Sequence, residues 1–394
     1  MHRVDNRAGI LGTGGTRSAC PWPSRSGAVE LVRRWVRLGV AVALAVWMAL
    51  PASSAAAFGT IDSGGQHREH ERITRAALAC AADPGPGDGC FEPASMDFLA
   101  GHDREFGGVG APDSDEISVP AAHCDNADFL EVSYPRTRMQ ATAGLVDCVD
   151  HLRDRFAEAV DGAGALLDVE GRIVEEEVDL DVECRVFEAA EGRARCAVLE
   201  AFGRVLHGVQ DFYAHSNWAD QADPARAIGA DNPPGLALPA PSSVLDLRSG
   251  TPPIVPDDLT TGCFVVRDEV PGVGECGGRV THAALNKDNG LVDPTTGKTA
   301  DPTTPRGMVG DNFAKAVAGA IEESRRQWQD FRSALATQYG EEDAALMACA
   351  LTRDDPADDC RDRGRDRILV GVLALAVAAT VAMMLLRARH LRRA

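Results

Sequence analysis

The sequence predicts a mainly α-helical domain, because long helical periodicities dominate it and strand signals are few. Four segments carry apolar residues three and four positions apart, a spacing that gathers them on one face of a helix. These segments span 68–82, 138–168, 182–213 and 311–339. We therefore expect a single helical domain over residues 58–340, with a long irregular insert at 219–308.

Each predicted helix has its own apolar face. In the first, Ile73 and Leu78 share a face, and the Pro-Gly-Pro-Gly run at 84–87 stops the helix. The faces of the second and fourth helices are Leu145, Val149, Leu152, Phe156 and Val160, and Phe313, Val317, Ile321, Trp328 and Phe331. Residues 101–135 are expected to form loops. The insert is rich in Pro, Gly, Asp and Thr, and irregular segments of such length are usually functional or tied by disulfides.

The first 57 residues have the features of a secretory signal. Residues 32–37 are basic, residues 38–50 are apolar, and small residues follow up to Ala57. This order is typical of a signal peptide over 1–57, and cleavage after Ala57 would make Phe58 the first mature residue. An uncleaved membrane anchor is the alternative.

The C-terminal end has the features of a membrane anchor. Residues 368–386 contain no charge and are long enough for one transmembrane helix. A juxtamembrane segment at 341–367 precedes this helix. The arginines of 387–394 favour a cytoplasmic tail, because positive flanks remain inside. We therefore expect an exported domain with a single transmembrane pass.

The cysteine count supports export. The chain has 11 cysteines, and Cys20 would leave with the signal. The even number that remains predicts disulfides outside the cell, although spacing alone does not fix their connectivity. Neighbour pairing is the simplest arrangement, because each bond closes a short loop. The pairs would be 80–90, 124–148, 184–196, 263–276 and 349–360.

The most specific motif runs from Leu206 to Trp218 in the third predicted helix. His207, Asp211 and His215 are four residues apart, and each step of four advances about 40° around a helix, so they would share one face. Imidazole nitrogens and carboxylate oxygens are the ligands that Zn²⁺ takes when thiols are absent. The alternative is an ordinary amphipathic helix with solvated polar residues.

Three further clusters contain similar side chains. His70 begins the first helix, where a charged surface helix is the alternative interpretation. Asp113, Asp115 and His123 lie in an acidic loop, where solvated acids are the alternative. His282 precedes an Asn-Lys-Asp run, and a histidine at a helix start is common on its own.

In this order the four clusters resemble the zinc-dependent phospholipase C and single-strand-specific nuclease superfamily, nearest its Het-C-like branch and the actinobacterial CinY-like proteins. The resemblance runs from Phe58 to about Asp288 and implies a helical fold of the phospholipase C type with one to three Zn²⁺ ions. Phe58 would supply its amine and carbonyl, and Asp211 would bridge two ions. The implied ligands are Phe58, His70, Asp113, His123, His207, Asp211, His215 and His282.

The chain departs from that pattern in three places. His215 follows His207 more closely than in the phospholipases. Asn286 stands where the family has an acid, and Asp288 could substitute only with a different local geometry. The separation of Asp113 from His123 is short, so Asp115 stays a candidate.

The resemblance implies a phosphodiesterase in which metal-activated water attacks phosphorus, with Asp113 and Asp211 as the catalytic carboxylates. The net charge of −19 makes nucleic acid an unlikely partner, because nucleic-acid binding usually needs a basic surface. We therefore expect the substrate to be a lipid or a small phosphoester. The predicted location is the extracellular face of a bacterial cell membrane. The alternative is a non-catalytic surface metalloprotein in which zinc is a structural staple. The sequence alone does not distinguish the enzyme from the structural metalloprotein, and it does not predict the oligomeric state.

Overall fold

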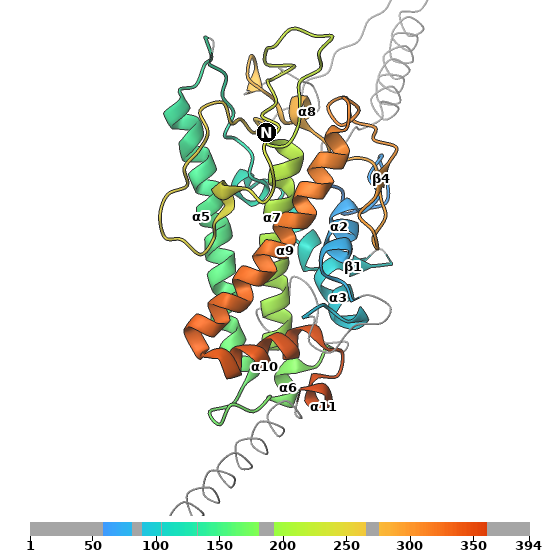
Figure 1. Cartoon of the computed structure of the whole chain (residues 1–394), viewed down its shortest axis with the longest axis vertical. Coiled ribbons are helices and arrows are strands. Elements are labelled where there is room, and N and C mark those ends of the chain that lie inside the picture. Colours follow the sequence, from blue (N-terminus) through green and yellow to red (C-terminus); the bar gives the residue numbers. More distant parts are fainter. Residues whose placement is uncertain are drawn as a thin grey trace, which may run out of the picture. The chain divides into compact units, whose positions relative to one another are not determined.

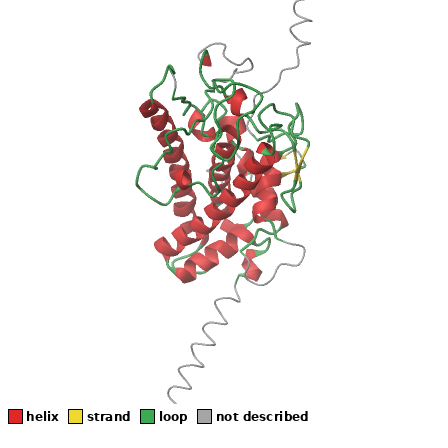
Figure 2. Ribbon diagram, turned by 45° about the horizontal axis from the view of Figure 1, so that its top comes forward, coloured by secondary structure: helices red, strands yellow, loops and turns green. Residues whose placement is uncertain are grey.

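The computed structural model describes residues 58–80, 89–103, 105–131, 133–180, 193–264 and 276–360. This part of the chain is mainly helical, as predicted (Figures 1 and 2). The predicted signal peptide (1–57), transmembrane helix (368–386) and tail (387–394) lie outside it. No helix among the described residues has the length and apolarity needed to cross a bilayer.

Three long helices form the core. They are α5 (Arg138–Gly162), α7 (Ala194–His215) and α9 (Asn312–Tyr339), and α7 packs against both of the others. Figure 1 shows α7 between α5 and α9. Nearly every residue of α7 is buried, because its neighbours cover it on all sides. The polar side chains of its second half, His207, Gln210, Asp211 and His215, have no exposed surface.

Shorter helices complete the domain. α2 (Glu69–Leu78) packs on α9, and α3 (Pro93–Ala100) packs on α7 and α2. The expected juxtamembrane residues up to Cys360 fold as α10 (Glu341–Thr352) and α11 (Pro356–Asp359), and α10 packs on α9. The helical domain thus extends past residue 340. Near the opposite end from α10 lies α8 (His282–Leu285), as Figure 1 shows.

The remaining elements are short. Two antiparallel pairs, β1–β2 and β3–β4, are the strands of the described residues. Their bounds are Gly101–His102, Glu105–Phe106, Leu291–Val292 and Thr299–Ala300. Short helical turns are η1 (Gly108–Gly110), α4 (Pro112–Asp115), η2 (Pro120–His123), η3 (Ala163–Leu166), α6 (Glu175–Val178) and η5 (Ser243–Leu245). In the described part of 219–308, only η5, α8, β3 and β4 interrupt the loops.

Helix ends differ from the predicted ones for local reasons. The first helix ends at Leu78 because Cys80 is bonded to Cys90 and its N–H donates to Phe91, which draws the chain out of the helix. The second ends at Gly162 and tightens into η3. The third continues two residues past the predicted end, to His215, which keeps this histidine in helical register.

Four of the predicted disulfides are confirmed. They are Cys80–Cys90, Cys124–Cys148, Cys263–Cys276 and Cys349–Cys360. Cys196 is disulfide-bonded too, whereas Cys184 lies outside the described residues. One of these bonds, Cys124–Cys148, attaches the loop that carries His123 to α5.

Candidate metal centre

The motif on α7 lies in the interior of the domain. His207, Asp211 and His215 have no exposed surface, so the alternative of solvated polar residues on an amphipathic helix is wrong. Buried ionisable groups need charged or hydrogen-bonding partners, because an unpaired charge in the interior is costly. These three side chains meet their partners on loops and on α2.

Asp211 lies at the middle of the first cluster and divides its two oxygens between different imidazoles. Oδ1 is 3.1 Å from His70 Nε2. Oδ2 is 2.9 Å from His123 Nδ1 and 3.0 Å from His207 Nε2. Ligand atoms around a tetrahedral zinc with bonds of ~2.0–2.1 Å lie roughly 3.3 Å apart, so these spacings are close to those of a metal site.

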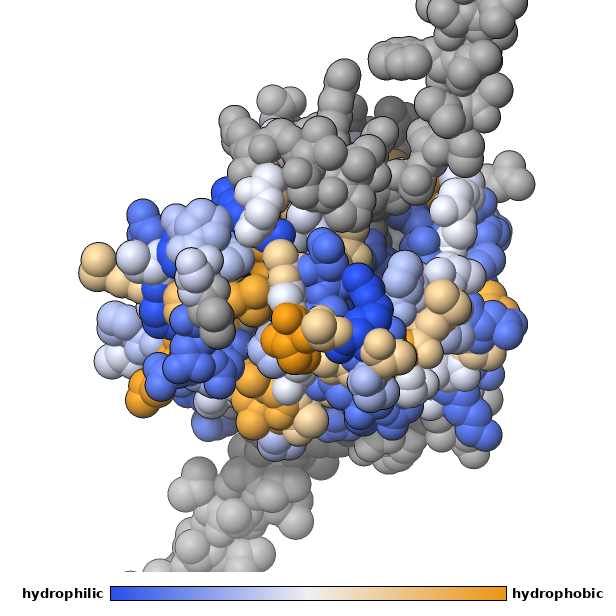
Figure 3. All heavy atoms as spheres, turned by 90° about the horizontal axis from the view of Figure 1, so that it is seen from above, coloured by the Kyte–Doolittle hydropathy of each residue, from blue (hydrophilic) through white to orange (hydrophobic). Residues whose placement is uncertain are grey.

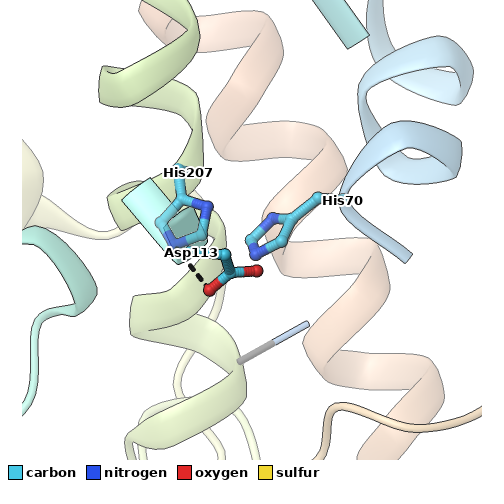
Figure 4. Close-up of side chains that lie close together, drawn as sticks. All are labelled: His70, Asp113 and His207. Carbon is cyan, nitrogen blue, oxygen red and sulfur yellow. Dashed lines mark ion pairs between the residues drawn. The ribbon is translucent and has the colours of Figure 1, made fainter. Parts of the chain in front are cut away.

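Asp113 is the fifth member of this first cluster. Figure 4 shows its carboxylate directed toward the imidazoles of His70 and His207, and Oδ1 is 3.8 Å from His207 Nε2. Oδ2 accepts a hydrogen bond from the Thr60 hydroxyl. The other candidate, Asp115, instead forms a bidentate ion pair with Arg204, with N···O distances of 2.9 and 2.7 Å. The interpretation of Asp115 as a ligand is therefore wrong.

Hydrogen bonds fix the tautomer of His70. Its Nδ1–H donates to Gln210 Oε1 at 2.8 Å. The amide of Gln210 is itself oriented, because its Nε2 donates to the hydroxyls of Thr74 and Ser324. Nε2 of His70 is thereby directed toward Asp211 Oδ1. Such outer hydrogen bonds typically orient a metal-binding imidazole.

His207 and His123 are oriented in the same way by backbone carbonyls. Nδ1 of His207 donates to Val109 O at 2.8 Å, and Nε2 of His123 donates to Glu116 O at 3.3 Å. Their other nitrogens, His207 Nε2 and His123 Nδ1, lie 2.9 Å apart, and both face Asp211 Oδ2. Two lone pairs would repel at this distance, so positive charge belongs here, carried by a proton or by a bound cation.

A close approach of glycines places one of these carbonyls. Gly203 on α7 contacts Gly108 of η1 so tightly that a Cβ on Gly203 would lie 2.3 Å from the Gly108 carbonyl carbon. No other residue fits there without displacement of η1. The contact brings Val109 O onto His207 and keeps Asp113, just beyond η1, near the cluster.

A second cluster lies at the end of α7. The rings of His215 and His282 lie with their centroids 4.1 Å apart and are tilted by 58° to each other. Asp125 Oδ2 is 3.1 Å from His282 Nδ1 and 3.6 Å from His215 Nδ1. On the other side, Asp288 Oδ1 is 3.1 Å from His215 Nε2. All four side chains are buried.

Asp125 was not among the predicted site residues, because acidic residues in loops are usually solvated and nothing local in the sequence separates it from them. Cys124 and Asn126 on either side of it have positive φ values of 52° and 64°. The resulting tight turn sends His123 to the first cluster and Asp125 to the second. The Cys124–Cys148 bond attaches the turn to α5. The sequence signal that could have indicated Asp125 is Cys124, a disulfide cysteine directly between it and the predicted ligand His123.

Phe58 and Glu69 lie next to the first cluster. Phe58 is fully buried, and its ring meets the His70 ring edge-on, with centroids 5.8 Å apart. The Gly59 N–H donates to Glu69 Oε2 at 2.9 Å, which holds the segment against α2. Burial raises the pKa of Glu69 to about 7, although backbone N–H groups of Gly290 and His67 oppose this rise. Sequence reasoning missed Glu69, because acids are ordinary in the first turn of a helix.

Several buried atoms of the two clusters have no hydrogen-bond partner within the described residues. They are His70 Nε2, Asp211 Oδ1, Asp125 Oδ1 and Asp288 Oδ2. The first two face each other at 3.1 Å, and Asp288 Oδ2 is 3.6 Å from His282 Nε2, so their contacts are ion pairs without hydrogen-bond geometry. An unsatisfied buried polar group costs about 1–3 kcal/mol, and more when it is charged. Each is a nitrogen or oxygen of the type that binds zinc. These residues could therefore hold metal ions.

The electrostatics of the clusters favour cations. Burial alone would raise the pKa of Asp211, but the imidazoles of His207, His215 and His70 hold it well below its usual range. Burial would lower the pKa of His282, but Asp125 and Asp288 raise it well above its usual range. The lowered pKa of Asp211 and the raised pKa of His282 both favour positive charge beside the carboxylates, from protons or from metal ions.

A small cavity joins the clusters. Its walls are Asp113, His123, Asp125, His215 and His282, with Ile117 and Phe264 as apolar walls. Its volume of about 10 Å³ is close to the smallest that holds one water molecule. Figure 3 views the domain from the end that carries α8; on the part formed by described residues, small apolar groups lie among hydrophilic ones.

The fold and the clusters define a helical protein with buried histidine and aspartate groups able to hold metal ions. Comparison with protein-family models, with curated proteins and with solved structures finds no match to this chain.

Proposed function

We propose that this chain is an exported, membrane-anchored, zinc-dependent phosphoesterase that hydrolyses a phosphodiester of a lipid or a small molecule. The observation that carries the proposal is the position of Asp211, whose two oxygens face two separate sets of imidazoles. A carboxylate in this position suits two ions side by side, the arrangement that many phosphoesterases use. The resemblance to the zinc-dependent phospholipase C superfamily rests on the same residues.

Under this proposal the ligand residues of the first cluster form two sets, one for each ion. His123 and His207 would hold one ion at Asp211 Oδ2, and His70 with the backbone of Phe58 would hold the other at Oδ1. When bound, such ions acidify a water molecule and stabilise charge on phosphate oxygens. Asp113 lines the cavity with 16% of its side chain exposed, so it can accept a hydrogen bond from that water and orient it.

A structural role for the metal is the second candidate. Sites that only stabilise a fold are closed to solvent, whereas catalytic sites keep one position open. The small volume of the cavity and the burial of the ligands favour a closed site. Under this alternative the ions would bind fully without any turnover.

Hydrolysis of a chromogenic phosphodiester separates the two candidates. The full-length chain is purified from membranes in detergent, loaded with zinc, and assayed on bis(p-nitrophenyl) phosphate, a phospholipid and single-stranded DNA. We expect turnover of a diester that a chelator abolishes and added zinc restores. Full metal content with no turnover on any diester would contradict the enzyme and favour the structural role.

A further inference from the structure

The imidazoles of the second cluster lie between two carboxylates. His215 directs Nδ1 toward Asp125 and Nε2 toward Asp288, at 3.6 and 3.1 Å. His282 does the same, at 3.1 and 3.6 Å. One carboxylate therefore faces both Nδ1 atoms, and the other faces both Nε2 atoms.

An imidazole that binds a metal uses one nitrogen for the ion and donates the N–H of the other to an acceptor. Asp125 and Asp288 consequently have different roles if an ion binds here. One carboxylate joins the two histidines as a ligand. The other accepts their N–H groups and aims the lone pairs at the ion.

The cavity indicates whether an ion would bind on the Asp125 side or on the Asp288 side of the two imidazoles. The cavity between the clusters is lined by Asp125, His215 and His282, whereas Asp288 does not line it and is fully buried. One atom from each of these three lining residues lies within 4.8 Å of the others. Hydrogen-bond geometry does not separate the two sides, because Asp288 Oδ1 has it to His215 Nε2 and Asp125 Oδ2 has it to His282 Nδ1, both at 3.1 Å. His215 Nδ1 is also 3.4 Å from the backbone oxygen of His123, a long contact. Asn286 Nδ2 is 3.4 Å from His282 Nε2, a contact too long to decide its tautomer.

We infer that Asp125 is the carboxylate ligand of a second metal centre, with His215 and His282, and that Asp288 is the positioning residue behind both imidazoles. Asp125 thereby supplies, from a different loop, the acid that Asn286 does not provide. Its Oδ2 faces both Nδ1 atoms, at 3.6 and 3.1 Å, and the residue lines the cavity in which an ion could enter. The inference rests on the metal-binding part of the proposed function and is independent of catalysis.

Zinc titration of matched variants tests this division. Apo full-length protein in detergent is titrated with Zn²⁺ alone, and ions per chain and their affinities are measured for wild type, Asp125→Asn and Asp288→Asn. We expect Asp125→Asn to bind one ion fewer. We expect Asp288→Asn to keep the wild-type number and to bind one ion roughly 10–100-fold more weakly, since an amide oxygen still accepts one N–H. Asp211→Asn is the control that empties the first cluster.

The reverse pattern, in which Asp288→Asn loses an ion and Asp125→Asn only weakens one, would overturn the assignment. Unchanged ion number in both variants would show that no ion binds at this cluster. Nitrogen NMR of histidine-labelled wild type avoids any folding defect of the variants. We expect zinc to shift Nδ1 of three histidines that retain Nε2–H, namely His215, His282 and His123 of the first cluster. Zinc-dependent shifts of Nε2 at both His215 and His282 would contradict the inference. Neither the zinc titration nor the NMR experiment depends on turnover. A failure of the enzyme proposal can therefore be told apart from a failure of this metal-ligand assignment.

Discussion

Asp211→Asn is expected to remove metal from the first cluster and to lower diester hydrolysis by more than about 100-fold, since loss of an outer hydrogen bond alone costs roughly 10–100-fold. Asp211 contacts His70, His123 and His207, and among the described residues it is the one carboxylate paired with all three. An amide keeps the shape of the side chain but removes its charge, so the ions lose their shared ligand. Metal content and hydrolysis rate are measured on the same preparations.

Asp150→Asn is the matched control for this variant. Asp150 lies on α5, and its side chain is 59% exposed in an ion pair with Arg153. Exposed pairs of this kind contribute about 0–1 kcal/mol, so metal content and activity should stay at wild-type values. An Asp211→Asn protein that keeps all of its metal would rule out the bridging role.

Removal of the Cys124–Cys148 bond is expected to cost about 3 kcal/mol of unfolding free energy and to release metal as well. Cys124 lies between His123 and Asp125, which reach into different clusters. The bond to α5 holds this turn in place, so the double variant Cys124→Ser with Cys148→Ser should misplace ligands of both clusters. Thermal unfolding and metal per chain are the measurements.

Another disulfide of the same chain provides the control. Cys80 and Cys90 close a shorter loop, and Cys80 lies ten residues from His70, about 15 Å away at the other end of α2. Their replacement by serine should lower stability by a similar amount, about 3 kcal/mol, with metal content unchanged. If both double variants lose metal equally, the effect is one of general stability and not of ligand placement.

The helical class and the site motif on α7 could be predicted from sequence for a physical reason. Helical periodicity and the spacing of His207, Asp211 and His215 are local properties of the chain, and the structure keeps them on one helix. Neighbour pairing of the cysteines rested on short loops and holds for four bonds. The end of the first helix was misplaced because a disulfide overrides local propensity there.

The second cluster could not be assembled from sequence. Asp125 meets His282 across 157 positions of the chain, and no local pattern encodes that contact. The choice between Asp113 and Asp115 depends on Arg204, which lies 89 positions from Asp115. Such partners come together only when the loops pack over the end of α7. Burial was equally inaccessible, because α7 is covered on all sides and shows no exposed stripe.

The central claim is tested most directly by counting the metal ions bound to the zinc-reconstituted mature chain, including its membrane anchor. Anomalous scattering at the zinc edge, measured on the same protein, locates these ions. We expect about two or three ions per chain, with peaks at Asp211 and beside His215 and His282. Fewer than about 0.2 ions per chain after reconstitution, or peaks only at surface residues, would contradict the metal centre.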